Sequence, residues 1–259
     1  FMQGLFERTH ILLGDEKIER LKNARVFIAG LGGVGSFAAE ALARMGVGHL
    51  TLVDCDVVAA SNVNRQLVAL NSTVGQNKAD IMAARVRDIN PDVQLMVMTD
   101  FMNRELFEAH FAENQYDYVL DCIDSLNCKV ALIEVAYKLG LNVASSMGAG
   151  GKTDPSQIKV SDLYDTNVCH LASKMRQRLK RLNVGTGIRT VYSTEPPLPP
   201  LPPAPTSAGR PRAVNGTVSY LPPLFGFTLA GLVVRDLTGI SEPLKRKNVR
   251  KGYKPKGMT

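Results

Sequence analysis

A glycine-rich stretch near the start of the chain has the spacing of a phosphate-binding turn. Gly30-Leu-Gly32-Gly33-Val-Gly35 fits the pattern G-x-G-x-x-G, in which glycines let the backbone turn tightly and approach a phosphate closely. A helix that begins at the end of this stretch would add free N–H groups and a partial positive charge. The stretch therefore predicts nucleotide binding by Gly30, Gly32, Gly33 and Gly35. The alternative is a tight turn without a ligand.

The residues that follow the turn favour ATP over NAD. Asp54 ends the next apolar run, where an acidic side chain can accept hydrogen bonds from a ribose hydroxyl. A dehydrogenase needs no cation aimed at a terminal phosphate, whereas adenylation builds charge on a leaving pyrophosphate that fixed cations stabilise. The candidate cations are Arg65, after a helix cap predicted at Ser61, and Lys78, at the start of a helical pattern. Each taken alone can equally be a solvated surface cation.

A carboxylate after the fourth apolar run is the candidate metal ligand. Asp121-Cys-Ile-Asp124 ends that run, and in a parallel sheet the carboxyl ends of the strands face the ligand crevice. Mg²⁺ prefers oxygen ligands, so Asp124 can hold Mg²⁺ against a triphosphate. In a competing interpretation, Asp124 caps a helix that begins near Ser125.

These residues need a framework of alternating strands and helices. Short apolar runs predict buried strands, and longer runs with helical spacing predict helices between them. The alternation predicts an α/β fold with a Rossmann-like, doubly wound, mostly parallel sheet covered on both faces. We predict strands over 25–29, 49–53, 93–98, 116–120, 142–146 and 158–162, and helices over 34–45, 78–89, 128–139 and 171–182.

The chain divides into an adenylation domain, an extension of the same fold and a tail. Residues 1–150 hold the ATP-binding pattern, and residues 151–240 are predicted to bind substrate and complete the sheet. Residues 196–205 are proline-rich and predict an exposed loop, because proline cannot continue a helix or an inner strand. Residues 241–259 form a basic tail, and from position 245 onward it holds seven cations and no acid, which equals the whole net charge of +7: Lys245, Arg246, Lys247, Arg250, Lys251, Lys254 and Lys256.

The composition excludes several classes of protein. Hydrophobic residues make up 45% of the 259 residues, which is ordinary for a globular protein with a core. The most apolar stretch, 218–234, contains Pro222 and Pro223, so no membrane-spanning helix is predicted. The four cysteines form no C-x-x-C pair, which argues against the usual zinc spacing and suits free thiols in a reducing cytoplasm.

As a set, the motifs resemble the ThiF/MoeB/HesA superfamily, the ancestors of ubiquitin-activating enzymes. The matching segments are RVFIAGLGGVGS, LTLVDCDVV, SNVNRQ, VGQNKA, INP and VLDCIDS. The resemblance implies ATP and Mg²⁺ as cofactors, with Asp124 on the metal, and a homodimer in which Arg8 reaches into the partner's site. It implies a nucleotide site lined by Asp54, Asp56, Asn62, Arg65, Gln66 and Lys78, with Arg65, Lys78, Asp124 and Arg8 serving catalysis.

The second half resembles the tRNA threonylcarbamoyladenosine dehydratase branch of this superfamily, in GAGGKTDPSQIKVSDLYDT, LASKMRQRLKRL, VYSTEPP and NGTVSYLPPLFGF. The resemblance implies adenylation of the threonyl carboxylate of a modified adenosine in tRNA, followed by ring closure on the neighbouring carbamoyl group. It suggests a monovalent cation, Na⁺ or K⁺, and leaves room for a cysteine desulfurase or sulfur-acceptor partner. A tRNA substrate would also explain the cations of one predicted helix, which could follow an RNA backbone together with the tail: Lys174, Arg176, Arg178, Lys180 and Arg181.

Other interpretations stay open at this point. Those cations can be an ordinary solvated helix face, and DNA is not expected as a partner. Adenylation of a small sulfur-carrier protein, as by ThiF/MoeB-type enzymes, is the main alternative, and the missing zinc cysteines argue against it. A nucleotide-sensing scaffold and an NAD dehydrogenase are further alternatives. Ring closure within the substrate needs no enzyme thiol, but Cys122 and Cys128 flank Asp124, and Cys169 stands beside His170, so a reactive cysteine is conceivable.

Overall fold

Short apolar runs form the middle of one sheet in the computed structural model, which describes residues 4–202 and 215–247. The sheet has seven strands in the order β3-β2-β1-β4-β5-β7-β6. All neighbouring strands are parallel except β6 and β7, which pair antiparallel. The strands are β1 (Arg25–Ala29), β2 (His49–Val53), β3 (Gln94–Met98), β4 (Tyr118–Asp121), β5 (Asn142–Ser146), β6 (Ile158–Asp162) and β7 (Ile188–Ser193).

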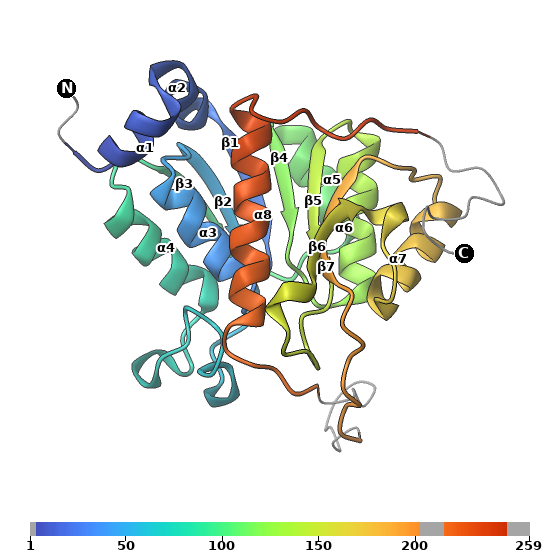
Figure 1. The fold of residues 1–259 in the computed structure, drawn as a ribbon. Coiled ribbons are helices and arrows are strands. Elements are labelled where there is room, and N and C mark those ends of the chain that lie inside the picture. The colour runs from blue at the N-terminus through green and yellow to red at the C-terminus, as the bar shows by residue number, and fades with distance from the viewer. Residues whose placement is uncertain (1–3, 203–214, 248–259) are drawn as a thin grey trace.

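Helices cover both faces of the sheet (Figure 1). One hydrophobic cluster joins the sheet to α2, α3, α4 and α8, and a second joins it to α5, α6 and α7. The α-helices are α1 (Glu7–Leu13), α2 (Asp15–Asn23), α3 (Gly35–Arg44), α4 (Lys78–Ile89), α5 (Arg104–Glu113), α6 (Leu126–Lys138), α7 (His170–Arg181) and α8 (Leu221–Leu237).

The architecture confirms the predicted α/β fold. Strands β1, β2, β5 and β6 and helix α4 have the predicted bounds, and the ends of the other predicted elements differ by at most two residues. The sequence-based prediction omits β7, α1, α2 and α5. In β7, Arg189 and Thr190 interrupt the apolar pattern although the strand is almost fully buried.

The apolar stretch 218–234 contributes most of α8. Pro222 and Pro223 lie in the first turn of this helix, where the missing N–H of proline removes no hydrogen bond within the helix. None of the helices in the described parts of the chain combines the length and apolar character needed to cross a membrane. The prediction of no spanning helix agrees with this finding.

The sheet has two ends, which we call the carboxyl edge and the amino edge. The carboxyl edge is where β1, β2, β4, β5 and β7 end, and it lies toward the bottom of Figure 1. The amino edge is where the same strands begin and where α8 ends. Because neighbouring parallel strands point the same way, the segments after β1, β2, β4 and β5 are brought together at the carboxyl edge.

Candidate active site

The glycine turn connects β1 to α3 at the carboxyl edge, and its backbone leaves no room for side chains. Gly30 has a φ of 87°, and a Cβ there would lie 2.7 Å from the Cys122 carbonyl oxygen. A Cβ on Gly35 would lie 1.7 Å from the Gly30 carbonyl oxygen. Gly30 and Gly35 are therefore required by close backbone contacts within the turn and against the segment after β4. The arrangement supplies the tight strand–turn–helix that phosphate binding needs.

Asp54 joins the end of β2 to the turn. One carboxylate oxygen accepts a hydrogen bond from the Leu31 N–H at 2.6 Å, and the other accepts one from the Asp56 N–H at 2.8 Å. Burial raises the pKa of Asp54 above its ordinary value, although both N–H donors oppose the shift. The carboxylate is thus held beside the turn, where a ribose would accompany a bound phosphate.

Lys78 opens α4 and points back toward the same loop. Its side chain is buried, and its Nζ donates to an Asp56 carboxylate oxygen at 3.0 Å, while Asp56 itself is exposed. The positive charge of Lys78 also acts on Asp54, since it favours the ionised carboxylate there. The sequence-predicted pair Asp54 and Lys78 is therefore brought together.

Arg65 and Gln66 pack directly against the turn. A Cβ on Gly33 would lie 3.5 Å from Arg65 Cγ, and one on Gly32 would lie 3.4 Å from Gln66 Nε2. The guanidinium of Arg65 donates only to neutral groups of its own loop, the Ser61 carbonyl at 3.0 Å and Asn64 Oδ1 at 2.8 Å. Its charge is thus held beside the glycines without a carboxylate partner in the described part of the chain.

Asn62 organises the loop that carries Arg65. Its Oδ1 accepts from the Ala59 N–H at 3.0 Å, and its carbonyl accepts from the N–H groups of Arg65 and Gln66. The helix cap predicted at Ser61 is wrong, because the short 3-10 helix Ala60–Asn62 begins after Ala59 and Asn62 makes the local hydrogen bond. Whether Asn62 also meets a triphosphate stays a prediction.

Asp124 follows β4 beside the turn and is exposed. The interpretation of Asp124 as a helix cap is wrong, since α6 has Ser125 at its N-cap and no side-chain cap hydrogen bond. A single exposed carboxylate suits Mg²⁺, which proteins usually hold through one or two carboxylates together with substrate phosphates and water. No group of three or more His, Cys, Asp or Glu that could hold a metal alone occurs within residues 4–202 and 215–247.

A buried ion pair beneath this segment was not predicted. Lys129 Nζ donates to an Asp121 carboxylate oxygen at 2.6 Å, the Ser145 hydroxyl donates to the same oxygen at 2.6 Å, and all three side chains are fully buried. Burial raises the pKa of Asp121, while the Lys129 ammonium and the Ser145 hydroxyl favour its ionised form. The available signal was a lysine inside the apolar run of α6, eight residues after a strand-ending aspartate.

A strap formed by residues 215–222 crosses the carboxyl edge and was also missed. The Asn64 side chain donates to the Thr217 carbonyl at 2.9 Å, and a Cβ on Gly33 would lie 2.9 Å from Pro222. On the other side, the Gly151 N–H donates to the Gly216 carbonyl at 2.7 Å. The strap therefore connects the glycine turn to the segment that follows β5.

The basic helix α7 divides its cations between two environments. Arg176 is half-buried and donates to the carbonyl of Thr166 at 3.0 Å and to its hydroxyl, and burial lowers the pKa of the guanidinium. One guanidinium nitrogen of Arg176 is thus used within the protein, and whether Arg176 also meets an RNA backbone stays a prediction. Lys180 is half-buried, and the exposed cations are Lys174, Arg178 and Arg181.

The described part of the basic tail is packed against the protein. Arg246 donates to the Tyr137 carbonyl at 2.6 Å and to that of Leu141, and its guanidinium lies 4.4 Å from the centre of the Tyr137 ring. Arg246 of the basic tail is therefore held against the protein by its side chain. The remaining predicted tail cations Arg250, Lys251, Lys254 and Lys256, and positions 203–205 of the proline-rich loop, lie outside the described residues.

The four cysteines are all free thiols, and of the three that the sequence offered for catalysis Cys122 and Cys169 are poorly suited to act as nucleophiles. Burial raises the pKa of Cys122 to about 12, so its thiol stays protonated. Cys169 is buried in the cluster beneath α7, and His170 beside it is exposed. Arg8 is exposed on α1, a helix without any buried residue.

Comparison with known proteins agrees with this geometry. A profile described as the ThiF family matches residues 6–256. The chain is 38% identical over 239 residues to a tRNA threonylcarbamoyladenosine dehydratase of Bacillus subtilis, covering 90% of this chain and 94% of that one. The enzyme of the same name from Escherichia coli is 42% identical over 197 residues, 73% of each chain. The E. coli enzyme TcdA, solved in complex with ATP, superposes with a TM-score of 0.81 at 36% identity, covering 91% of this chain and 94% of that chain.

Proposed function

The chain belongs to the ThiF family, and from this membership we propose that it is an ATP-dependent tRNA threonylcarbamoyladenosine dehydratase. One arrangement carries the proposal: Asp54 accepts from the glycine turn, the Arg65 stem packs against that turn, and Lys78 pairs with Asp56 two residues after Asp54. The similarity to dehydratases spans both halves of the chain, since it covers 90–91% of the residues.

The proposed reaction begins when the threonyl carboxylate of the modified adenosine attacks the α-phosphorus of ATP. The bond to pyrophosphate breaks, and the charge that grows on this leaving group is stabilised by the fixed cations Arg65 and Lys78. Asp54 accepts hydrogen bonds from the ribose and orients the nucleotide. Asp124 would hold Mg²⁺, which supplies charge neutralisation on the phosphates when it is bound.

The second step is closure of the ring. The carbamoyl group attacks the activated carbonyl of the same residue, AMP leaves, and the substrate has lost the elements of one water. Both groups belong to one substrate, so holding them in contact replaces covalent catalysis. The protonated thiol of Cys122 and the buried position of Cys169 are consistent with a mechanism that needs no enzyme nucleophile.

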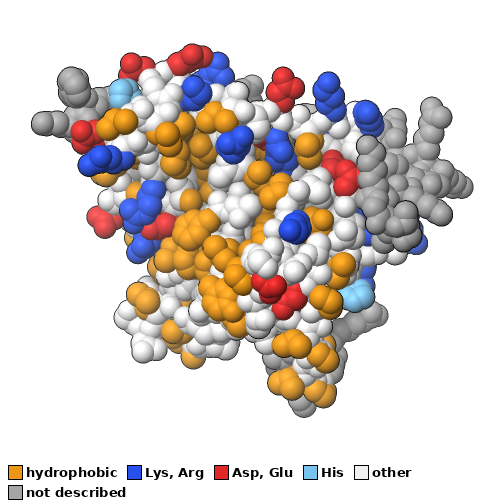
Figure 2. All heavy atoms as spheres, in the orientation of Figure 1, with side chains coloured by type: hydrophobic (Ala, Val, Ile, Leu, Met, Phe, Trp, Pro, Cys, Tyr) orange, Lys and Arg blue, Asp and Glu red, His pale blue; other side chains and the backbone are white. Residues whose placement is uncertain are grey.

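The proposal includes a tRNA surface and a second copy of the chain. Lys174, Arg178 and Arg181 share the exposed side of α7 and would neutralise RNA phosphates. Hydrophobic side chains gather over α3 and α8 (Figure 2), where Phe37 and Phe227 contact edge to face and Phe227 is exposed. Such a face, together with Ile11 and Leu12 exposed on α1, is what a homodimer would cover. Arg8 on the same helix would then serve the partner's site.

Three finer elements also remain proposals. A monovalent cation, Na⁺ or K⁺, would assist near the site, and a cysteine desulfurase or sulfur acceptor would be a further partner. Free cysteines suit a reducing cytoplasm as the place of action.

The test is direct conversion of the substrate. Purified protein is incubated with ATP, Mg²⁺ and threonylcarbamoyl-modified tRNA, and the nucleosides are analysed by mass spectrometry. We expect a product lighter by one water that requires ATP and is absent with unmodified tRNA. Pyrophosphate exchange driven by a small carrier protein, with no conversion of the tRNA, would contradict the proposal and favour a sulfur-carrier adenylyltransferase.

A further inference from the structure

The buried cluster of Asp121, Lys129 and Ser145 joins three elements at the carboxyl edge. Asp121 ends β4, Lys129 lies in the first turns of α6, and Ser145 belongs to β5. One Asp121 oxygen accepts from both Lys129 and Ser145 at 2.6 Å, and the Lys129 Nζ lies 3.5 Å from the Ser145 hydroxyl. All three side chains are inaccessible to solvent.

Stability alone is a weak reason for such a pair. Removing two charges from water costs several kcal/mol per ion, and the attraction between them only roughly repays this. Replacement of a buried ion pair by neutral groups of similar volume is often neutral or stabilising. The cluster therefore calls for a role that depends on its geometry.

The second oxygen of Asp121 points to that role. It accepts from the Ile123 N–H at 3.3 Å and so fixes the turn that directly precedes Asp124. Within the same turn, the Cys122 carbonyl lies where a Cβ on Gly30 would be only 2.7 Å away. Lys129 holds the other end of the segment, because it ties the start of α6 to β4. The segment between these anchors both backs the glycine turn and carries the candidate metal ligand.

Charge gives the cluster a second effect on the same site. An ionised Asp121 without a partner would place a buried negative charge behind a turn that must accept phosphate. Lys129 neutralises that charge at 2.6 Å. Since electrostatic interactions are strong in a buried, low-dielectric environment, the neutralisation would be felt at the turn.

We propose that Lys129, Asp121 and Ser145 are positioning residues that set the Cys122–Asp124 turn for binding ATP and Mg²⁺. The inference rests on the proposed use of ATP at this edge, and it requires nothing about the tRNA. It assigns these side chains no contact with the nucleotide; they act through the backbone of the turn and through Asp124.

The experiment compares two neutral replacements at opposite ends of the sheet. The double variant D121N/K129M keeps the approximate volume of the pair and removes its charges. The control D236N/R189M does the same to the ion pair at the amino edge, in which Arg189 Nε donates to Asp236 at 2.6 Å. ATP affinity is measured by calorimetry over a range of Mg²⁺ concentrations, and the unfolding midpoint is measured without ligand.

We expect D121N/K129M to weaken ATP binding by about 10- to 100-fold, the usual cost of removing groups that orient a ligand to a metal. The half-saturating Mg²⁺ concentration should rise, while the unfolding midpoint is kept. Adding D124A to this variant should weaken binding less than D124A does in the wild type, because both changes remove one interaction. The control variant should bind ATP as the wild type does.

Wild-type ATP affinity and Mg²⁺ dependence in a folded D121N/K129M variant would overturn the inference, as would full additivity with D124A. If the double variant does not fold, S145A replaces it, since this change removes one hydrogen bond and leaves the ion pair. Weaker ATP binding by S145A supports the inference, and unchanged binding overturns it. A wild-type protein that binds ATP without converting modified tRNA contradicts only the proposed function, because the inference is measured through binding.

Discussion

Two buried ion pairs stand at opposite ends of the same sheet, and their surroundings differ. At the amino edge, Arg189 donates to both oxygens of Asp236, at 2.6 and 2.7 Å, and the hydroxyls of Tyr118 and Ser241 donate to the same carboxylate at 2.9 and 2.5 Å. At the carboxyl edge, the pair of Lys129 and Asp121 lies beneath a turn whose Asp124 is exposed. The groups around Asp236 are thus paired with one another, whereas the pair of Lys129 and Asp121 lies beneath a turn whose carboxylate is open to solvent.

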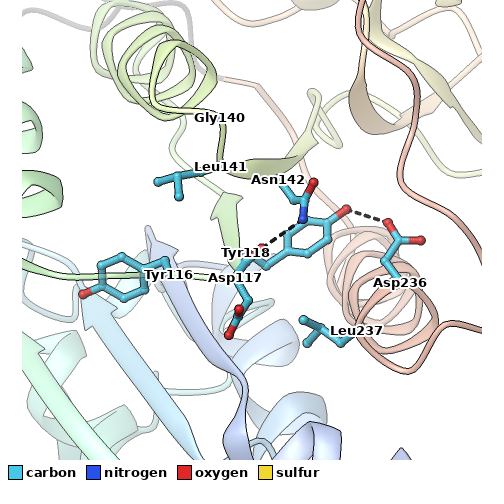
Figure 3. A pocket seen from close by; sticks show the side chains of 8 residues that line it. All are labelled: Tyr116, Asp117, Tyr118, Gly140, Leu141, Asn142, Asp236 and Leu237. Atoms are coloured by element: carbon cyan, nitrogen blue, oxygen red, sulfur yellow. Dashed lines mark hydrogen bonds between the residues drawn. The ribbon is translucent and has the colours of Figure 1, made fainter.

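The amino edge also has a hollow. A hollow of about 330 Å³ lies there, between the starts of β4 and β5 and the end of α8, and in it the Tyr118 hydroxyl faces the Asp236 carboxylate (Figure 3). The Tyr118 hydroxyl is already used by Asp236, and the Asn142 side chain donates to the Asp117 carbonyl at 3.2 Å. Burial raises the pKa of Tyr118, so the phenol stays neutral.

The comparison shows that polar groups paired with one another contribute to stability, whereas a charge that contacts only neutral groups indicates a binding site. The hydroxyls of Tyr118 and Ser241 and two nitrogens of Arg189 already donate to Asp236, so this carboxylate offers a ligand little. Arg65, in contrast, donates only to neutral oxygens beside a turn shaped for phosphate. The carboxyl ends of parallel strands, rather than the hollow at the amino edge, therefore locate the site.

The largest expected effect breaks the amino-edge network. Asp236→Ala should lower the free energy of unfolding by about 3–5 kcal/mol, because it leaves Arg189 buried without its carboxylate. Urea unfolding measures the loss, and calorimetry on the folded protein should show unchanged ATP affinity. Weakened ATP binding at unchanged stability would show that the two edges are not separate.

Removing a cation at the carboxyl edge should have the opposite effect, a loss of activity rather than of stability. Lys78→Ala or Arg65→Ala should lower kcat by about 10²–10³-fold, since each removes a donor that stabilises the leaving pyrophosphate. Steady-state pyrophosphate release with modified tRNA measures the effect. Arg20→Ala, at an exposed position of α2 where Arg20 pairs with Glu16, is the matched control and should leave kcat unchanged. Near-normal turnover by both site variants would favour the scaffold interpretation.

Two glycines allow a further comparison of the two edges, because a Cβ added at either one would lie 1.7 Å from a carbonyl oxygen. Gly35 would meet Gly30 at the carboxyl edge, and Gly48 would meet Lys22 at the amino edge. Gly35→Ala and Gly48→Ala should each cost about 1–3 kcal/mol of stability through overpacking. Only Gly35→Ala should also weaken ATP binding, as measured by calorimetry on the folded fraction. Equal ATP affinities in the two variants would mean that the glycine turn does not take part in nucleotide binding.

Sequence reasoning succeeded where short-range pattern decides structure. The strands β1 and β2 are apolar runs ended by a glycine or an aspartate, so their bounds were read without tertiary information. Strand β7 was missed because Arg189 argues against a buried strand. Its partner Asp236 lies 47 residues away and is known only from the fold.

The candidate site divides in the same way. The turn, Asp54 and Lys78 were predicted because strand ends and helix starts locate them. Helical spacing did not reveal that Arg176 has an acceptor in the preceding loop, the carbonyl of Thr166. The cluster on Asp121 was missed for the corresponding reason, since Ser145 comes from a strand 24 residues farther along. The sequence pattern did not show which groups, distant along the chain, pair with a buried charge.

The smallest expected effect is a pH dependence confined to the carboxyl edge. Burial raises the pKa of Asp54 above its ordinary value of 3.8, so the folded protein binds a proton there more readily than the unfolded chain does. As the pH falls toward that raised value, Asp54 loses the charge that accepts ribose hydrogen bonds, and ATP affinity should fall, by at most about tenfold per pH unit for one proton. Over the same range the contribution of Asp54 to the stability of the free protein should rise, since its ionised form is the one that burial disfavours. The wild type and Asp54→Asn are compared across this pH range, with ATP affinity measured by calorimetry and the free energy of unfolding measured without ligand. As the pH falls, the ATP affinity of the wild type relative to Asp54→Asn should fall, while its relative free energy of unfolding should rise. A fall of both would mean that Asp54 acts on the fold rather than on the nucleotide.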